Sequence, residues 1–313
     1  MLTREQFVGP WAGLPIAWTA LAPDCRFDEA TYRADVARCC AAGVPGVYTG
    51  GTTGEFYALE IEEFRAVTDA TVGECHAAGV PAMIGCTATH TAGVIRRARY
   101  AAEAGADAIQ VALPFWMEVP DAEVLPFFTA VSAAVRGMPI TIYETLRARK
   151  AIPLEIHRAI HEAVPAVIGV KANDGTVGKT PEGCAAISEW YNVFVGEPAL
   201  AELGPHGAVG SCSSLVYQNP RIVLQAAELL RDQRWEELAA WTDRLRRLIV
   251  EGLAPCLAAG LVDSALDRVL GLSAGFLRTS LHCRPPYPSA TPEQLEGFRG
   301  WLRAHDPEFL ELE

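Results

Sequence analysis

Short apolar runs alternate with longer segments of helix-like apolar spacing over roughly the first 220 residues of the chain. Short runs bounded by turn residues are typical of buried strands, and the longer segments, rich in Ala, Glu and Arg, are typical of helices. The predicted strands are residues 13–18, 46–48, 82–85, 108–112, 140–143, 167–171, 193–195 and 207–210. The predicted helices between them include residues 61–79, 91–105, 122–136, 154–164 and 181–190.

Eight strand-helix units of this size predict a (β/α)₈ TIM barrel. Glycines such as Gly43, Gly79 and Gly105 end several helices just before the next strand, as left-handed C-caps do. Past residue 220 the strand pattern stops. The segments there that read as helices are residues 221–232, 236–252, 264–269 and 292–305. We therefore expect a barrel over residues 1–220 and a C-terminal helical region over residues 221–313 that completes the same domain.

Composition narrows the function classes. The chain is 50% hydrophobic with a formal net charge of −12, which is no electrostatic footprint for nucleic acid or anionic lipid. No long uninterrupted apolar run predicts a membrane helix, and no export signal is recognisable. The nine cysteines are scattered without paired C-x-x-C spacing, which favours a reducing cytoplasm and argues against a zinc site.

One of the three lysines stands out by its position. Lys150 and Lys179 lie in polar, turn-like sequence, whereas Lys171 ends the apolar run of residues 166–171. Burial disfavours an ammonium ion, so an amine at the end of a buried strand can be partly neutral and nucleophilic near pH 7. Two interpretations remain from the strand alone: a Schiff-base lysine, or an ordinary lysine paired with a carboxylate.

Two further groups lie at the ends of predicted strands, where a TIM barrel carries its chemistry. After the second strand, Gly51 precedes Thr52 and Thr53 in a glycine-rich turn whose hydroxyls and amides suit a small carboxylate. Tyr143 ends the fifth strand. With Lys171, these residues supply a nucleophile for a 2-oxo acid, a proton relay and hydrogen-bond donors for its carboxylate.

These motifs resemble the dihydrodipicolinate synthase and N-acetylneuraminate lyase family of class I aldolases over nearly the whole chain. Residues 51–55 resemble the family's carboxylate-binding signature, Tyr143 falls at its strand-five tyrosine, and Lys171 at its imine-forming lysine. Residues 207–211 are similar to its strand-eight glycine pattern, and residues 284–286 to its C-terminal Arg-Pro-Pro segment.

The resemblance implies a class I lyase mechanism without a metal or organic cofactor, acting on pyruvate or another 2-oxo acid. In that mechanism Lys171 forms the imine, Tyr143 shuttles protons and Thr53 belongs to the catalytic group. Gly210 and Ser211 supply backbone contacts to the substrate carboxylate. The resemblance also implies a homotetramer built from two dimers.

The chain departs from the family after the fourth strand. True dihydrodipicolinate synthases carry a tyrosine pair there that completes a proton relay across the dimer, and this chain has Phe115 and Trp116. Neither ring relays protons through a hydroxyl. The two rings either pack at a subunit contact or line the substrate pocket.

Other departures concern specificity. Glu144 follows the strand-five tyrosine in place of the family's Asn; it either contacts a polyhydroxylated substrate or pairs with Arg147 or Arg149. Arg147 is the nearer match for the arginine that holds the second substrate's carboxylate. After the seventh strand, Glu197 stands where the family has a Gly-Asp or Gly-Asn type of turn, on the expected pocket side.

The sequence therefore predicts a lyase that cleaves, condenses or dehydrates a 2-keto-3-deoxy acid. The loss of the tyrosine pair favours this over the first alternative, dihydrodipicolinate synthase proper. A second alternative is a non-catalytic 2-oxo acid binding protein, since binding needs fewer correctly placed groups than catalysis. A metal-dependent barrel aldolase is disfavoured, because no His, Asp and Glu cluster with ligand spacing follows the strands.

Overall fold

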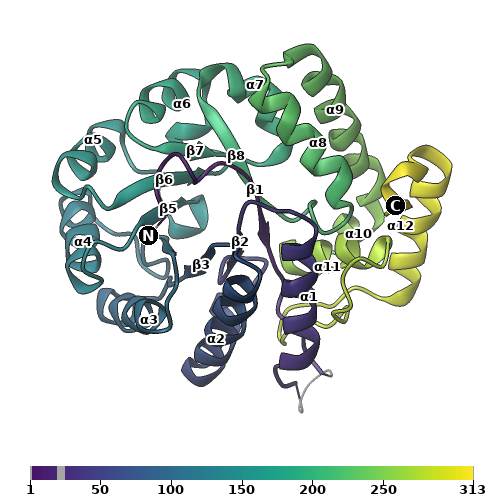
Figure 1. Cartoon of the computed structure of the whole chain (residues 1–313), viewed down its shortest axis with the longest axis horizontal. Helices are drawn as coiled ribbons and strands as arrows, with labels where there is room; N and C mark the ends of the chain where they lie inside the picture. Colours follow the sequence, from purple (N-terminus) through teal and green to yellow (C-terminus); the bar gives the residue numbers. More distant parts are fainter. Residues whose placement is uncertain (1, 20–24, 313) are drawn as a thin grey trace.

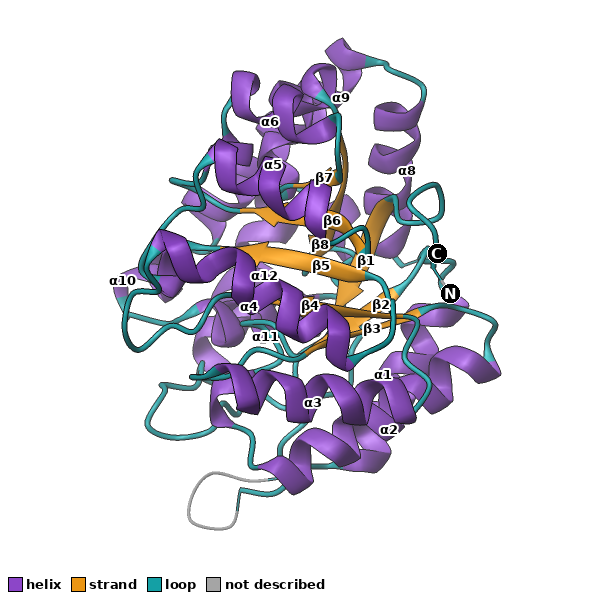
Figure 2. Cartoon of the chain, turned by 90° about the vertical axis from the view of Figure 1, so that its left-hand side faces the viewer, coloured by secondary structure: helices purple, strands orange, loops and turns teal. Residues whose placement is uncertain are grey.

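The computed structural model describes residues 2–19 and 25–312, and its eight parallel strands close into one barrel in chain order. Helices follow the strands and surround them, so the predicted TIM barrel is confirmed (Figures 1 and 2). The strands are β1 Gly9–Gly13, β2 Val47–Thr49, β3 Ala82–Gly85, β4 Ala108–Val111, β5 Ile140–Glu144, β6 Val167–Ala172, β7 Asn192–Phe194 and β8 Ala208–Ser213. The helices of the barrel layer are α1 Glu29–Ala41, α2 Ile61–Ala77, α3 Thr91–Glu103, α4 Asp121–Ala134, α5 Leu154–Ala163, α6 Pro181–Ser188, α7 Leu200–Leu203 and α8 Pro220–Arg231.

The C-terminal helices lie together on one side of the barrel, near α8 and α1 (Figure 1). They are α9 Trp235–Arg247, α10 Ala254–Ala258, α11 Asp263–Ser273 and α12 Pro292–His305, and the π-helical turn η6 Leu248–Gly252 extends α9. Within the described ranges no helix is both long and apolar enough to cross a membrane.

The first strand is the main error of the sequence-based prediction. Residues 14–18 are buried but lie outside the barrel sheet, and β1 ends at Gly13, the first residue of the predicted strand, after pairing with β2 and β8. Pro15 interrupts the predicted strand, and a proline has no N–H to donate in the middle of a sheet. Two apolar runs follow one another here, so periodicity alone did not separate them.

An aromatic plug fills the barrel beneath the site. Phe7, from the segment before β1, stacks on Phe194 with ring centroids 4.2 Å apart and meets Trp11 edge-on at 5.0 Å. A Cβ at Gly169 would lie 2.4 Å from the Phe7 ring, so a glycine in β6 makes room for the plug. The plug stands two residues below Lys171 on β6 and closes the barrel under the amine.

Candidate active site

Lys171 lies inside the barrel between two tyrosines. Val170 and Ala172 on either side belong to the outer core, so the alternation of the strand turns Lys171 inward. Tyr143 on β5 is its partner in register, and the Lys171 Nζ lies 4.4 Å from the centroid of the Tyr143 ring. Tyr48 on β2 faces the same amine from 5.4 Å. The structure thus brings the predicted nucleophile and the predicted proton relay together.

Two opposed effects act on the pKa of the Lys171 amine. Burial lowers it, whereas ionised Tyr143, Tyr48 and Cys212 raise it, and with those anions present the net direction is upward. Phenols and thiols ionise only above neutral pH, and burial raises the pKa of Tyr48 and of Cys212 further. The effect that remains near pH 7 is burial, which favours a neutral, nucleophilic amine.

The glycine-rich turn after β2 reaches over this amine. The Thr52 Oγ1 lies 2.9 Å from the Tyr143 hydroxyl, so the two form one hydrogen-bonded pair. Gly51 lies directly on Tyr48, because a Cβ at Gly51 would stand 1.5 Å from the Tyr48 hydroxyl oxygen. Only glycine allows this close approach. Gly51 and Thr52 therefore contact the two tyrosines that face the amine.

Thr53 is placed differently from the prediction. The Thr53 Oγ1 donates a hydrogen bond to Asp267 of α11. Thr53 is also absent from the lining of the cavity that opens in front of Tyr143, which is described below. A threonine hydroxyl has one hydrogen to donate, so that donor is already used. Burial raises the pKa of Asp267 to about 7, and its hydrogen bonds to Thr53 and Ser214 oppose the rise. The predicted catalytic role of the Thr53 hydroxyl is thus not supported by its geometry.

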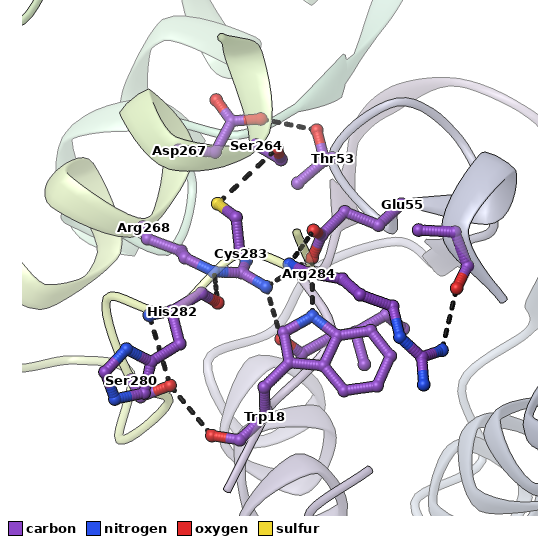
Figure 3. A network of polar contacts seen from close by, with 12 residues as sticks. Trp18, Thr53, Glu55, Ser264, Asp267, Arg268, Ser280, His282, Cys283 and Arg284 are labelled. Carbon is purple, nitrogen blue, oxygen red and sulfur yellow. Dashed lines mark hydrogen bonds and ion pairs between the residues drawn. The ribbon is translucent and has the colours of Figure 1, made fainter. Parts of the chain in front are cut away.

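A buried polar network holds the turn from below (Figure 3). Glu55 has a left-handed backbone, with φ of 45°, and a fully buried side chain. Its carboxylate accepts hydrogen bonds from the Trp18 Nε1 at 2.8 Å, the Arg284 backbone N at 2.9 Å and the Arg268 guanidinium at 2.5 Å. Because Arg268 lies on α11, the C-terminal helices anchor the loop that carries Thr52.

Glu144 does not face the pocket, which corrects both interpretations of its role. The strand alternation that turns Tyr143 inward turns Glu144 outward, against α5. Its carboxylate accepts a hydrogen bond from the Ile152 backbone N at 2.8 Å and lies 3.2 Å from the His157 Nε2. Both side chains are buried, and the contact is structural.

Glu197 and Ser211 do not line the cavity in front of Tyr143. Glu197 is buried between β8 and the outer helices, where it lines a small space together with Gly210 and Ser211. Burial raises the pKa of Glu197, and Ser213 and Ser211 lower it. Val209 and Cys212 are the residues of this strand that pack against the barrel interior. Neither Glu197 nor the Ser211 side chain reaches the cavity.

A cavity of about 240 Å³ opens in front of Tyr143 and Thr52. Phe115 lines it and meets Phe56 edge-on, with ring centroids 5.7 Å apart. Arg147 lines the mouth of the cavity, and its side chain is 60% exposed. Its guanidinium pairs with the Asp263 carboxylate of α11 at 3.0 Å.

The two rings after β4 therefore have different surroundings. Phe115 is a wall of the cavity, whereas the neighbouring Trp116 is 76% exposed beside Met117, which is 73% exposed.

Sequence reasoning missed three residues that surround the amine or its loop: Tyr48, Cys212 and Asp267. Tyr48 is the middle residue of β2, and the signal in this part of the chain came from the glycine-rich turn that follows the strand. Cys212 was hidden because the predicted eighth strand stopped at Gly210. No local signal marks Asp267, since its contact with Thr53 joins residues 214 positions apart.

The chain is similar in sequence to a known protein family. The model of the dihydrodipicolinate synthetase family matches residues 14–304. A 4-hydroxy-tetrahydrodipicolinate synthase of Agrobacterium fabrum (strain C58) is 30% identical over 240 residues, which are 75% of this chain and 80% of the relative.

The chain belongs to the dihydrodipicolinate synthetase family. Its members are lyases that use a Schiff-base lysine, and this protein is an enzyme of that class. The predicted family, fold and lyase class are thus confirmed. Among the described residues, no group of three or more His, Cys, Asp or Glu side chains is arranged to hold a metal ion.

Solved structures share the fold. The structure of PhdJ bound to a substrate intermediate has a TM-score of 0.82 at 25% identity and covers 98% of each chain. A catalytic lysine mutant of the Ruminococcus gnavus sialic acid aldolase has a TM-score of 0.84 at 18% identity, covering 99% of this chain and 100% of that one.

Proposed function

We propose that Lys171 forms an imine with the carbonyl carbon (C2) of pyruvate or a related 2-oxo acid, and that the protein cleaves or makes the C3–C4 bond of the acid. The observation that carries this proposal is the position of the Lys171 Nζ, which faces the rings of Tyr143 at 4.4 Å and Tyr48 at 5.4 Å. It lies at the end of the barrel where strands of this fold present catalytic groups.

The neighbouring groups match the steps of imine formation. The neutral amine attacks C2 of the 2-oxo acid, and Tyr143 passes protons to and from the carbinolamine oxygen, which leaves as water. Thr52 holds the Tyr143 hydroxyl in place at 2.9 Å. The backbone amides of the turn at Gly51 and Thr52 bind the substrate carboxylate, because successive N–H groups in a turn can donate to an anion.

Once formed, the imine withdraws electrons from the C3–C4 bond of a 4-hydroxy-2-oxo acid. Removal of the C4 hydroxyl proton breaks that bond, releases an aldehyde and leaves an enamine. A proton then adds to C3, and water hydrolyses the imine to pyruvate and the free amine. Phe115 supports cleavage over dihydrodipicolinate synthesis, because the ring that lines the cavity carries no hydroxyl for the relay of the true synthases.

Borohydride trapping tests the imine. The protein is incubated with pyruvate and borohydride, and the added mass is located by peptide mass spectrometry. The chain offers matched controls in its other two lysines, since Lys150 pairs with Asp121 and Lys179 with Asp174. We expect one adduct, at Lys171, lost in Lys171→Met and retained in Lys179→Met. An adduct at another lysine, or none with any 2-oxo acid, overturns the proposal.

Turnover separates the enzyme from a non-catalytic binding protein. A trapped adduct together with pyruvate release from a 4-hydroxy-2-oxo acid supports the lyase. An adduct without release from any acid of a broad panel supports the binding protein instead. We also propose that the protein is a homotetramer, which the family resemblance supports, and light scattering on protein eluting from a size-exclusion column measures the subunit number. A cytoplasmic location is proposed as well, supported by nine free thiols.

A further inference from the structure

The walls of the cavity indicate which part of a substrate it receives. Beyond the polar end at Tyr143 and Thr52, the surface is mainly apolar and aromatic. Its members come from several loops and meet in front of the reacting end: Phe56, Tyr57, Leu113, Phe115, Val262 and Tyr287. A substituent on carbon 4 of a bound 2-oxo acid has to leave through this space, because the plug of Phe7 closes the barrel below the amine.

The aromatic rings form a continuous wall. Phe56 contacts Phe115 edge-on at 5.7 Å and Tyr57 edge-on at 5.6 Å, and Tyr57 meets Tyr287 at 4.8 Å and 74°. A substrate ring in the cavity can contact the edges and faces of these side chains. Aromatic pairs prefer such offset or perpendicular contacts. The cavity of about 240 Å³ is small beside the roughly 300 Å³ at which typical ligand pockets begin. It suits a single ring.

The same walls carry few of the groups that recognise a sugar chain. Of the described residues lining the cavity, none is Asp, Glu, Asn, Gln or His. The Thr87 hydroxyl oxygen already accepts from the Ala112 backbone N at 3.0 Å, and the Tyr57 hydroxyl lies 3.3 Å from Ser264. The hydroxyls of a sugar substituent would lose their hydrogen bonds to water on entering this cavity. Without protein partners, that loss lowers the affinity of binding.

Two charged residues near the cavity do not alter this picture. Arg147 is paired with Asp263. Glu144, the acidic residue predicted to bind substrate hydroxyls, faces α5. A polyhydroxylated substituent would therefore find few partners for its hydroxyls along these walls.

We infer that the substrate is a 4-hydroxy-2-oxo acid whose carbon 4 carries a single aromatic ring, and that the products are pyruvate and an aromatic aldehyde. This inference rests on the proposed imine at Lys171. The ring occupies the aromatic wall, the carboxylate faces the turn at Thr52, and the C4 hydroxyl lies toward Tyr143, which takes its proton as the C3–C4 bond breaks. The bond electrons pass to the imine, giving the enamine that is protonated and hydrolysed as above.

Pyruvate release tests the ring preference. 4-Hydroxy-2-oxo-4-phenylbutanoate and 2-keto-3-deoxygluconate share the 4-hydroxy-2-oxo acid end and differ at carbon 4. With lactate dehydrogenase and NADH as the detector, we expect kcat/KM for the phenyl compound to exceed that for the sugar acid by at least about tenfold. Equal values, or a preference for the sugar acid, overturn the inference.

A pair of neighbouring variants shows whether the cavity wall is responsible. Phe115→Gln places an amide in the wall and should lower kcat/KM for the phenyl compound by at least about tenfold, with the pyruvate adduct at Lys171 retained. Trp116→Ala changes an exposed ring in the same loop and should leave the preference unchanged. Equal losses in both variants refute a specific role of the wall.

The two proposals fail in different ways. If wild-type protein gives no pyruvate adduct, the imine mechanism is wrong. If the adduct forms and the sugar acid is the better substrate, only the ring preference is wrong.

Discussion

Removing Arg268 should loosen the active-site loop from the C-terminal side. The Arg268 and Glu55 side chains are both fully buried, and their ion pair joins α11 to the turn that carries Thr52. Breaking a buried ion pair by deleting one partner costs about 3–5 kcal/mol, because the remaining charge is left uncompensated. In Arg268→Met, Glu55 keeps the donors of Trp18 and the Arg284 backbone, so we expect the lower end, about 3 kcal/mol.

Thermal unfolding and steady-state kinetics measure the two consequences of this change. For a chain of 313 residues, about 3 kcal/mol corresponds to a fall in Tm of roughly 5 °C. Because the loop positions Thr52 beside Tyr143, kcat with the best substrate should fall as well. The double variant Glu55→Gln/Arg268→Met removes both charges and should lose less stability than the two single variants added together. A fall in Tm below about 2 °C for Arg268→Met, or strictly additive losses, refutes the reasoning.

Three further predictions concern single sites. Gly51→Ala should lower Tm and abolish the borohydride adduct, since its Cβ would lie 1.5 Å from the Tyr48 hydroxyl oxygen. Adding Tyr48→Phe removes that oxygen and should restore part of the lost Tm. Burial raises the pKa of Asp267 to about 7. The stability that its protonated form gives is complete below about pH 4 and is lost as the pH rises through about 7, by at most about 4 kcal/mol. Asp267→Asn should flatten this fall in urea midpoints between pH 5 and pH 8; an unchanged slope contradicts it. Glu144→Gln should lower Tm, since it removes the buried partner of His157, yet leave kcat/KM within about twofold, and a selective loss of kcat would restore Glu144 to the site.

The barrel was predictable because its strands carry their own signal. Seven of the eight predicted strands lie within a few residues of the observed ones, and the first shares only Gly13 with β1, since a strand buried on both faces is a continuous apolar run between turns. The first failed where two apolar runs adjoin, and pairing with β2 and β8 decided between them. The C-terminal helices were predictable from their periodicity, but their docking was not.

The site was predictable where its residues stand at strand ends. Lys171 and Tyr143 were found because one interrupts an apolar run and the other ends one. Glu144 was misplaced because the residue after an inward tyrosine faces outward, and Thr53 because its partner Asp267 is remote in sequence. A period of two along the strand, applied to β5, would have corrected the first error. The second needed the tertiary packing of α11.

Chemistry and specificity lie on different parts of this chain. The amine, its two tyrosines and the plug below it belong to the barrel strands and the segment leading into them, whereas the cavity wall is built from loops and from Val262 and Tyr287 of the C-terminal region. Loops accept substitution more readily than the strands that position them. A change of ring at Phe115 therefore alters what fits in front of Tyr143 without moving Lys171. By contrast, the C-terminal region cannot vary as freely, because Arg268 also holds the loop of Thr52 through Glu55.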